Sequence, residues 1–234
     1  MPAVRCPFCQ ADMAPVTLEH TEGGPLTLDV CRGCDGLWFD AGEQFRLTAD
    51  TTLRLIKEVQ DHRGARRSQT LVRCPCPRCG LPLGSTYDLV RDVRYQYWRC
   101  PDRHGVLFGY FDFLRSQGLV RGLTDVEMAE LKAHAATVNC ANCGAPVAVG
   151  KDAVCAHCGA PLSMIDMNYL GRALKQMQVD AATPAASAPL PAAWPDPDRL
   201  LDNEAASSPY RMVGGGTAVN LLEAGLSILM ALLR

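Results

Sequence analysis

Hydrophobic and polar positions in the first 60 residues predict a small antiparallel sheet followed by a helix. Residues 15–18 and 26–30 have the pattern of two hairpin arms, with the Gly-Gly-Pro run at 23–25 as the turn and residues 36–39 as a third short strand. Asp40 and Glu43 have the spacing of a capping box, so we expect a helix to begin there. Its stripe runs to about residue 60 through Phe45, Ala49, Thr52, Ile56 and Val59.

The chain continues with further short elements and then changes in composition. Thr124 and Glu127 form a second capping-box pattern, ahead of a helix that includes Met128, Leu131 and Ala135. Another helical stripe reaches about residue 179 and consists of Ile165, Tyr169, Leu170, Ala173, Leu174 and Met177. Residues 181–208 are rich in Ala, Pro and Ser, which cannot form a packed core, so we expect a disordered linker over 181–216.

The C-terminal segment 217–234 is almost wholly apolar and predicts an amphipathic helix with a wide apolar face. Its first apolar row is Val219, Leu222, Leu226, Leu229 and Leu233, and the adjacent row is Leu221, Gly225, Ile228 and Leu232. The segment is shorter than a membrane span of about 20 apolar residues and contains Glu223. We therefore expect it to dock into a protein partner or to self-associate, with a weak membrane anchor as the alternative.

Cysteine usage defines the class of the protein. Twelve cysteines lie within the first 158 residues, mostly in close pairs, and the segments that they bound are too short to bury a stable core unaided. Metal or disulfide staples are therefore needed. The first residues lack a basic-then-apolar signal region, which favours a reducing cytoplasm and thiolate-bound metal over disulfides.

The first predicted metal site joins two knuckles, Cys6-Pro-Phe-Cys9 and Cys31-Arg-Gly-Cys34, across a 21-residue gap. Two ligands that are separated by two residues can reach one tetrahedral ion from a tight turn. Residues 5–47, with these knuckles and the tail Gly-Leu-Trp-Phe-Asp-Ala-Gly-Glu at 36–43, resemble the bacterial TFIIB-type transcription factor zinc-finger family. The resemblance implies zinc at Cys6, Cys9, Cys31 and Cys34, whereas the family name reflects the shape of a ribbon more than a role in transcription, and DNA binding is not carried over.

The second predicted site, in residues 74–113, is a divergent repeat of the first. Cys76 and Cys79 form its first knuckle, and Cys100 is followed by His104, which stands one position beyond the fourth ligand of the first repeat. Three thiolates and an imidazole are a normal structural zinc set, so we predict His104 as the fourth ligand. We predict Cys74 as a free thiol, with its replacement of a neighbouring ligand as the alternative. Residues 109–113 lack the Asp-Ala-Gly-Glu cap, so we expect the following helix to start later.

The third predicted site, in residues 138–162, consists of Cys140, Cys143, Cys155 and Cys158, with an 11-residue gap between the knuckles. Rubredoxin iron sites use the same Cys-x-x-Cys-Gly turn, so an electron carrier at 140–158 is an alternative. The gap is short for a rubredoxin, and ligand type and spacing favour zinc. The sequence therefore predicts three Zn²⁺ ions.

The distribution of charge along the chain helps to distinguish between the candidate partners. The formal net charge is −2, but residues 1–61 carry 5 Lys or Arg against 10 Asp or Glu, whereas residues 62–135 carry 12 against 7. Arginines at 63, 66, 67, 73, 78, 91, 94 and 99 lie among aromatic residues at 87, 95, 97 and 98. Strand alternation favours a solvated hairpin with one aromatic face in the core, and weak single-stranded nucleic-acid binding through residues 63–103 is the alternative.

The sequence thus predicts a small metal-stabilised α+β protein with tandem zinc ribbons, in which each short antiparallel hairpin is followed by a helix. The expected segments are ribbons with helices at 1–61, 70–136 and 137–180, the linker at 181–216 and the C-terminal helix at 217–234. No phosphate loop, nucleophile elbow or His-Glu-x-x-His pattern is present, so we expect no enzyme. A protein-interaction adaptor that binds through ribbon surfaces and residues 217–234 is the first hypothesis, and a nucleic-acid-associated factor is the second.

Overall fold

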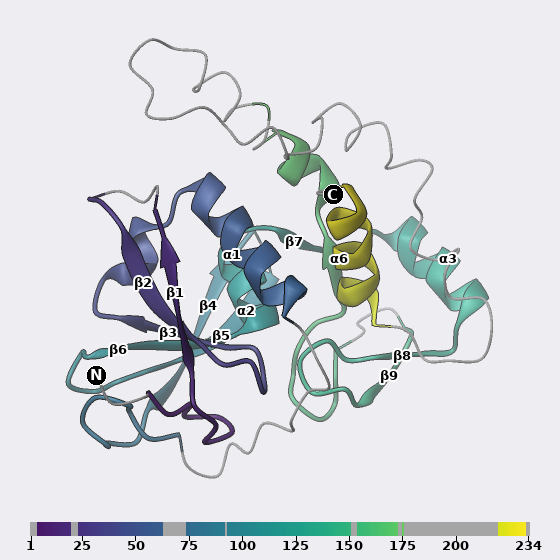
Figure 1. Ribbon diagram of the computed structural model, residues 1–234. Helices are drawn as coiled ribbons and strands as arrows, with labels where there is room; N and C mark the ends of the chain where they lie inside the picture. The colour runs from purple at the N-terminus through teal and green to yellow at the C-terminus, as the bar shows by residue number, and fades with distance from the viewer. Residues whose placement is uncertain are drawn as a thin grey trace. The chain divides into compact units, whose positions relative to one another are not determined.

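The computed structural model describes residues 4–19, 23–62, 74–91, 93–150, 154–172, 175 and 220–232. It is a small α+β structure with antiparallel sheets, and its chain divides into two compact units (Figure 1). The first unit comprises Met1–Asp88 with Tyr95–Phe113, and the second comprises Leu89–Arg94 with Leu114–Arg234. The predicted linker at 181–216 lies outside the described residues.

One six-stranded sheet contains both of the first two cysteine repeats, where the sequence suggested two separate ribbons. Its order is β1 (Ala14–Leu18), β2 (Leu26–Val30), β3 (Gly36–Asp40), β6 (Gly105–Gly109), β5 (Val93–Arg99) and β4 (Gly84–Val90). Strands β3 and β6 pair antiparallel from Gly36 opposite Gly109 to Asp40 opposite Gly105. This pairing joins two three-stranded halves, one from each repeat, into a continuous sheet.

Burial along the strands explains this order. Strand β2 alternates between buried and less buried positions, as expected for a strand with one solvated face. Gly36 to Phe39 of β3 are all buried, and β6 is buried at every position except Val106. Such nearly continuous burial is typical of central strands that are covered on both faces. Phe39 stacks on Phe113 and meets Phe108 edge-on, which fills the core on one side of the junction.

The helix after the first repeat begins later than the sequence indicates. Glu43 does accept a hydrogen bond from the backbone N–H of Asp40 at 2.8 Å, but only a short 3-10 turn, η1 (Glu43–Arg46), follows. Gly42 has a left-handed φ of 84°, so the backbone cannot continue as an α-helix from Asp40. Helix α1 (Ala49–Asp61) instead starts from a capping box formed by Thr48 and Thr51.

The predicted apolar stripe of this helix is correct only in its later part. Thr52, Ile56 and Val59 are buried, but Ala49 is exposed and Phe45 is 80% exposed on η1. After the second repeat the helix begins earlier than the sequence indicates. Helix α2 (Tyr110–Ser116) follows directly after β6.

The second unit contains the third cysteine cluster. Its elements are β7 (Val120–Gly122), α3 (Asp125–His134), β8 (Thr137–Asn139), β9 (Pro146–Ala148), β10 (Ser163–Ile165) and α6 (Leu221–Leu232). The capping box of Thr124 and Glu127 is present at the start of α3, as predicted. Ile165, which the sequence placed in a helical stripe, ends β10, and residues 167–172 are helical after it. Within the described residues, no helix has both the length and the apolar character needed to cross a membrane.

Candidate metal centres

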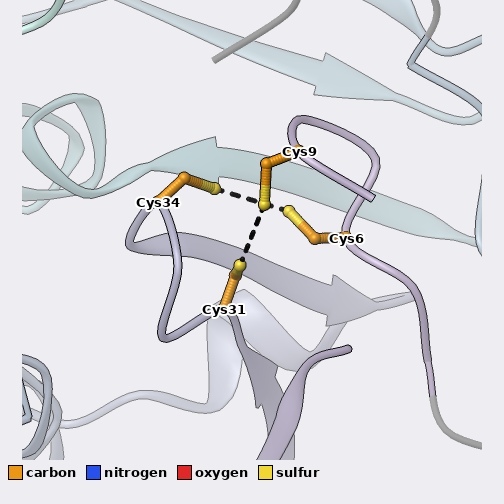
Figure 2. A group of neighbouring side chains, drawn as sticks. All are labelled: Cys6, Cys9, Cys31 and Cys34. Atoms are coloured by element: carbon orange, nitrogen blue, oxygen red, sulfur yellow. Dashed lines mark hydrogen bonds between the residues drawn. The ribbon is translucent and has the colours of Figure 1, made fainter. Parts of the chain in front are cut away.

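The first centre is formed by two turns that carry their cysteines toward one point (Figure 2). In each turn the N–H of the first cysteine is hydrogen bonded across the knuckle, from Cys6 to the carbonyl of Ala11 and from Cys31 to that of Gly36, both at 2.8 Å. The residues after Cys9 and Cys34 are left-handed, which closes each turn around the sulfurs. Cys6, Cys31 and Cys34 are buried and Cys9 is partly buried, so the cluster lies at the edge of the core.

The spacing of the donor atoms fits a tetrahedral ion. In each of the three predicted clusters the four ligand atoms lie within 4.8 Å of one another. Sulfur–sulfur distances are 3.5 Å for Cys6 to Cys34 and 3.4 Å for Cys9 to Cys31. A Zn–S bond of about 2.3 Å gives a tetrahedron edge of about 3.8 Å, close to these values. In the first cluster all four donors point inward, so four protein ligands are available to one ion (Figure 2).

The second centre brings together Cys76, Cys79, Cys100 and His104, the set that the sequence predicts. In the first repeat the N–H of Asp35 bonds to the carbonyl of Cys31, four residues back, and Asp35 is left-handed. In the second repeat the corresponding bond runs from Arg103 to Cys100, only three residues back, and Arg103 is left-handed instead. The turn therefore closes one residue early, and the next side chain, His104, faces the sulfurs with its Nδ1 at 3.5 Å from Cys100 Sγ.

Cys74 takes no place among these ligands. Its side chain is only 7% exposed and lies in a buried cluster with Phe8, Trp38 and Trp98. The same cluster contains buried cysteines of the first and the second centre, so one apolar core supports both sites. Burial raises the pKa of the Cys74 thiol, which keeps it protonated and unreactive.

The third centre, Cys140, Cys143, Cys155 and Cys158, belongs to the second unit. Its sulfur–sulfur distances are 3.5 Å for Cys140 to Cys158 and 3.6 Å for Cys143 to Cys155. Cys140 and Cys155 are buried, whereas Cys143 and Cys158 are exposed. Both knuckles end in a left-handed glycine, Gly144 or Gly159. This centre therefore has the same donor geometry as the first but is more open to solvent.

Hydrogen bonds between neighbouring thiols shift their pKa values in opposite directions within the clusters. Hydrogen bonds from the neighbouring thiols of Cys34 and Cys6 lower the pKa of Cys31 to about 2, and the same contacts raise the pKa of Cys34. In the third centre a hydrogen bond from Cys158 lowers the pKa of Cys140 to about 5. Without a metal ion, one thiolate is thus stabilised by thiols that keep their protons. A divalent ion that binds all four sulfurs must displace those protons.

Arg78, in the first knuckle of the second centre, is bound by carboxylates of the first repeat. Its Nε and one terminal nitrogen donate to the two carboxylate oxygens of Asp40 at 2.7 and 2.6 Å, and the same terminal nitrogen reaches Asp29 at 3.1 Å. Asp40 also accepts from Trp38 Nε1 at 2.9 Å. Burial alone would raise the pKa of Asp40, but hydrogen bonds from Arg78 and Trp38 lower it. This fork ties the second metal knuckle to strands β2 and β3.

Other members of the predicted basic and aromatic cluster also have structural roles. In the second unit Arg91 donates to Asp166 at 2.6 Å and to the carbonyl of Gly118 at 2.9 Å, and it lies 4.8 Å above the ring of Tyr169. Trp98 is buried. Tyr95 and Tyr97 stack on one another and on Phe108. Arg94 and Arg99 are exposed, and the arginines at 63, 66, 67 and 73 lie outside the described residues.

Comparison with known proteins bears on the first centre. Residues 5–49 match the transcription factor zinc-finger family, a TFIIB-type zinc ribbon. The resemblance of residues 5–47 to this family is thereby confirmed, and with the three ligand clusters it supports zinc as the metal. Neither the curated proteins nor the solved structures returned a match. The family covers the first cysteine cluster, strands β1 to β3 and η1, whereas the other two clusters rest on their own geometry.

The sequence analysis did not predict the contacts that link the first two centres. Arg78 was grouped with candidate nucleic-acid ligands, although its partners Asp40 and Asp29 lie about 40 and 50 residues earlier. Trp38 lies on β3 of the first repeat and Trp98 lies on β5 of the second, and both belong to the buried cluster around the cysteines. The sign of charge was a usable signal, because an acidic first repeat beside a basic second repeat favours ion pairs between them.

Proposed function

We propose that this chain is a non-enzymatic, multi-ribbon zinc protein that acts as a protein-interaction adaptor. The main support for the zinc-binding part of this proposal is that three sets of residues each bring four ligand atoms within 4.8 Å of one another. A closed tetrahedral site gives binding energy to folding and leaves no coordination position for catalysis. Zinc then serves as the staple that holds tandem ribbons, and function lies on their surfaces.

The proposed adaptor surface is centred on Phe45. This side chain is 80% exposed on η1, and Arg46 next to it donates to the backbone carbonyls of Gly23, Gly24 and Pro25. An exposed aromatic ring on an element that is anchored in this way resembles the aromatic anchors of protein interfaces. The surrounding segment 1–61 is acidic, which disfavours nucleic acid as its partner.

Metal analysis tests the structural part of the proposal. The purified chain should carry three zinc ions, remain colourless and lose its folded ribbons when a strong chelator removes the metal. Red colour with iron in the third centre would support the rubredoxin-like alternative. A zinc content of two or fewer would contradict the three-centre arrangement.

Affinity capture from lysate of the source cell tests the adaptor role. We expect one or more proteins to bind the wild-type chain and to be lost when Phe45→Glu removes the exposed ring. The matched control is Val126→Glu, because Val126 is also well exposed, at 68%, but lies on α3 in the second unit. Equal capture by the wild type and by Phe45→Glu would contradict the placing of the surface.

A nucleic-acid-associated role is the second candidate, and the exposed arginines of β5 favour it. Arg94 and Arg99 are exposed on that strand, and the matched family is described as a transcription factor zinc-finger. Against it, Arg78 and Arg91 are bound to carboxylates and Trp98 is buried, which removes much of the predicted stacking surface. Salt-sensitive binding of a single-stranded oligonucleotide that is abolished by Arg94→Ala with Arg99→Ala would reverse our preference.

A further inference from the structure

Helix α6 is an apolar helix that is already docked on its own chain. Asn220 caps its start, with Oδ1 accepting from the N–H groups of Leu222 at 3.1 Å and Glu223 at 3.4 Å. The buried positions along the helix are Leu221, Leu222, Ala224, Gly225, Leu226 and Leu229. Much of the face that the sequence assigned to a partner or a second copy is therefore buried by this chain, and α6 lies beside strand β10 of the second unit (Figure 1).

Helix α6 packs closely against strand β10. A Cβ atom at Gly225 would stand 2.9 Å from Cγ1 and 3.1 Å from Cβ of Ile165, so the glycine lets the helix backbone approach β10. Strand β10 itself pairs with β7, from Ser163 opposite Gly122 to Ile165 opposite Val120. A helix that depends on contact with a glycine fits this surface specifically, because a larger residue would push it away.

The same helix enters the core of the third metal centre. Leu221 belongs to one buried cluster with Leu131, Val138, Val147, Val149 and the two buried ligands Cys140 and Cys155. Leu221 and Asn220 also line one small hollow together with Cys140, Ala160 and Pro161. The first turn of α6 is thus packed against the metal knuckles.

The strand pairing described around that core is short. Strands β8 and β9 have three residues each, and the second knuckle adds an isolated bridge between Val154 and Pro161. Three paired residues cannot sustain a hairpin in water, so the four-thiolate ion must supply the missing constraint. Strand β10, against which α6 packs, begins at Ser163, only five residues after Cys158. An ordered second knuckle therefore also orders the strand that contacts α6.

We propose that zinc at the third centre controls α6: the metal-loaded ribbon binds the helix, and loss of the metal releases it. This inference rests on the zinc binding that is proposed above and adds a consequence to it. Release exposes an apolar face that includes Leu222, Leu226 and Leu229. The two exposed ligands, Cys143 and Cys158, make this centre more accessible to a competing chelator than the first. By linkage, α6 and zinc must strengthen each other's binding by the same factor.

Hydrogen exchange of the full chain tests the proposal, with the peptide over residues 221–232 as readout and zinc content measured on the same samples. Cys143→Ser with Cys158→Ser should reduce the zinc content from three to two and make the α6 amides exchange rapidly. The matched control, Cys9→Ser with Cys31→Ser, removes the first centre in the other unit and should leave α6 protected. Protected α6 amides in the first variant, or equal loss of protection in both variants, would overturn the proposal.

A second variant approaches the linkage from the helix side. Gly225→Val places side-chain atoms against Ile165 without altering a ligand, so we expect three zinc ions and unprotected α6 amides at saturating zinc. Alkylation of Cys143 and Cys158 at buffered zinc levels reports occupancy of the third centre alone. The free zinc that gives half protection should rise about 5- to 150-fold, the usual range of coupling between sites. An unchanged midpoint would reject the control of α6 by zinc, whereas thiols that zinc fails to protect even in the wild type would reject the third zinc site itself.

Discussion

Gly105 and Gly36 occupy equivalent positions in the two repeats but face different surroundings, which makes them a matched pair for mutation. A Cβ at Gly105 would lie 2.2 Å from the carbonyl oxygen of Phe39 and 2.6 Å from Cζ2 of Trp38. At Gly36 the nearest atom would be Cδ2 of Phe8 at 3.1 Å, a side-chain atom that can move. We therefore expect Gly105→Ala to be much more destabilising than Gly36→Ala.

The expected size follows from what must move. A carbon placed 2.2 Å from a backbone oxygen overlaps it by about 1 Å, and the backbone of β3 or β6 must shift to relieve the contact. Overpacking costs about 1–3 kcal/mol, and disturbance of a ladder hydrogen bond adds about 0.5–1.5 kcal/mol. Alanine also restricts the unfolded chain, which offsets about 0.4–1 kcal/mol in both variants. The net loss should be about 1–3 kcal/mol for Gly105→Ala and within about 0.5 kcal/mol of zero for Gly36→Ala.

Urea unfolding in zinc-saturated buffer measures this difference. Trp38 and Trp98 are both buried in the first unit, so tryptophan fluorescence reports its unfolding. Both variants should retain three zinc ions, since neither residue is a ligand. Equal midpoints for the two variants would refute the close approach of β6 to β3 at Gly105, and with it the shared sheet.

Three further outcomes are expected. Arg78→Ala should cost about 0.5–1.5 kcal/mol in the same urea assay, because it removes a forked ion pair that is one-third exposed, whereas exposed Arg99→Ala should change stability by less than about 0.5 kcal/mol. Glu127 is partly buried, but hydrogen bonds from its arginine and threonine partners lower its pKa. Its contribution to stability is thus present above the unfolded pKa of about 4.3 and lost as the pH falls through the folded value. An NMR titration midpoint at or above about 4.3 would contradict this. Metal analysis should return two zinc ions for His104→Ala and three for Cys74→Ala, and the opposite result would make the buried cysteine the ligand.

The local parts of the fold could be predicted from the sequence. Knuckle spacing gave the ligand sets, because a Cys-x-x-Cys turn needs nothing beyond its own residues and a partner turn. The missing cysteine at Arg103 also predicted His104, and the early closure of that turn explains why the next residue takes the role. The start of α1 was missed because reciprocal capping by Thr48 and Thr51 gives a weaker sequence signal than a serine or threonine followed by glutamate.

Pairing between strands that lie far apart in the sequence was harder to predict. The junction of β3 with β6 joins residues about 70 positions apart, and knuckle spacing carries no information on it. A signal did exist in the apolar runs Gly-Leu-Trp-Phe at 36–39 and Gly-Val-Leu-Phe at 105–108, which do not alternate. An unbroken apolar run is typical of a central strand, so neither repeat could end its sheet there with an open edge.

Duplication therefore changes what the zinc ions stabilise. A lone ribbon would expose the apolar strand at its edge, and pairing of two copies in one chain covers both edges at once. Buried cysteines of the first and second centres then share one apolar cluster. Loss of either ion therefore disturbs the residues that surround the other. The third centre lies in the second unit and shares its core with α6 instead of a second ribbon. Each metal core thus has a neighbour that completes it: for the first two centres it is another metal site, and for the third it is a helix.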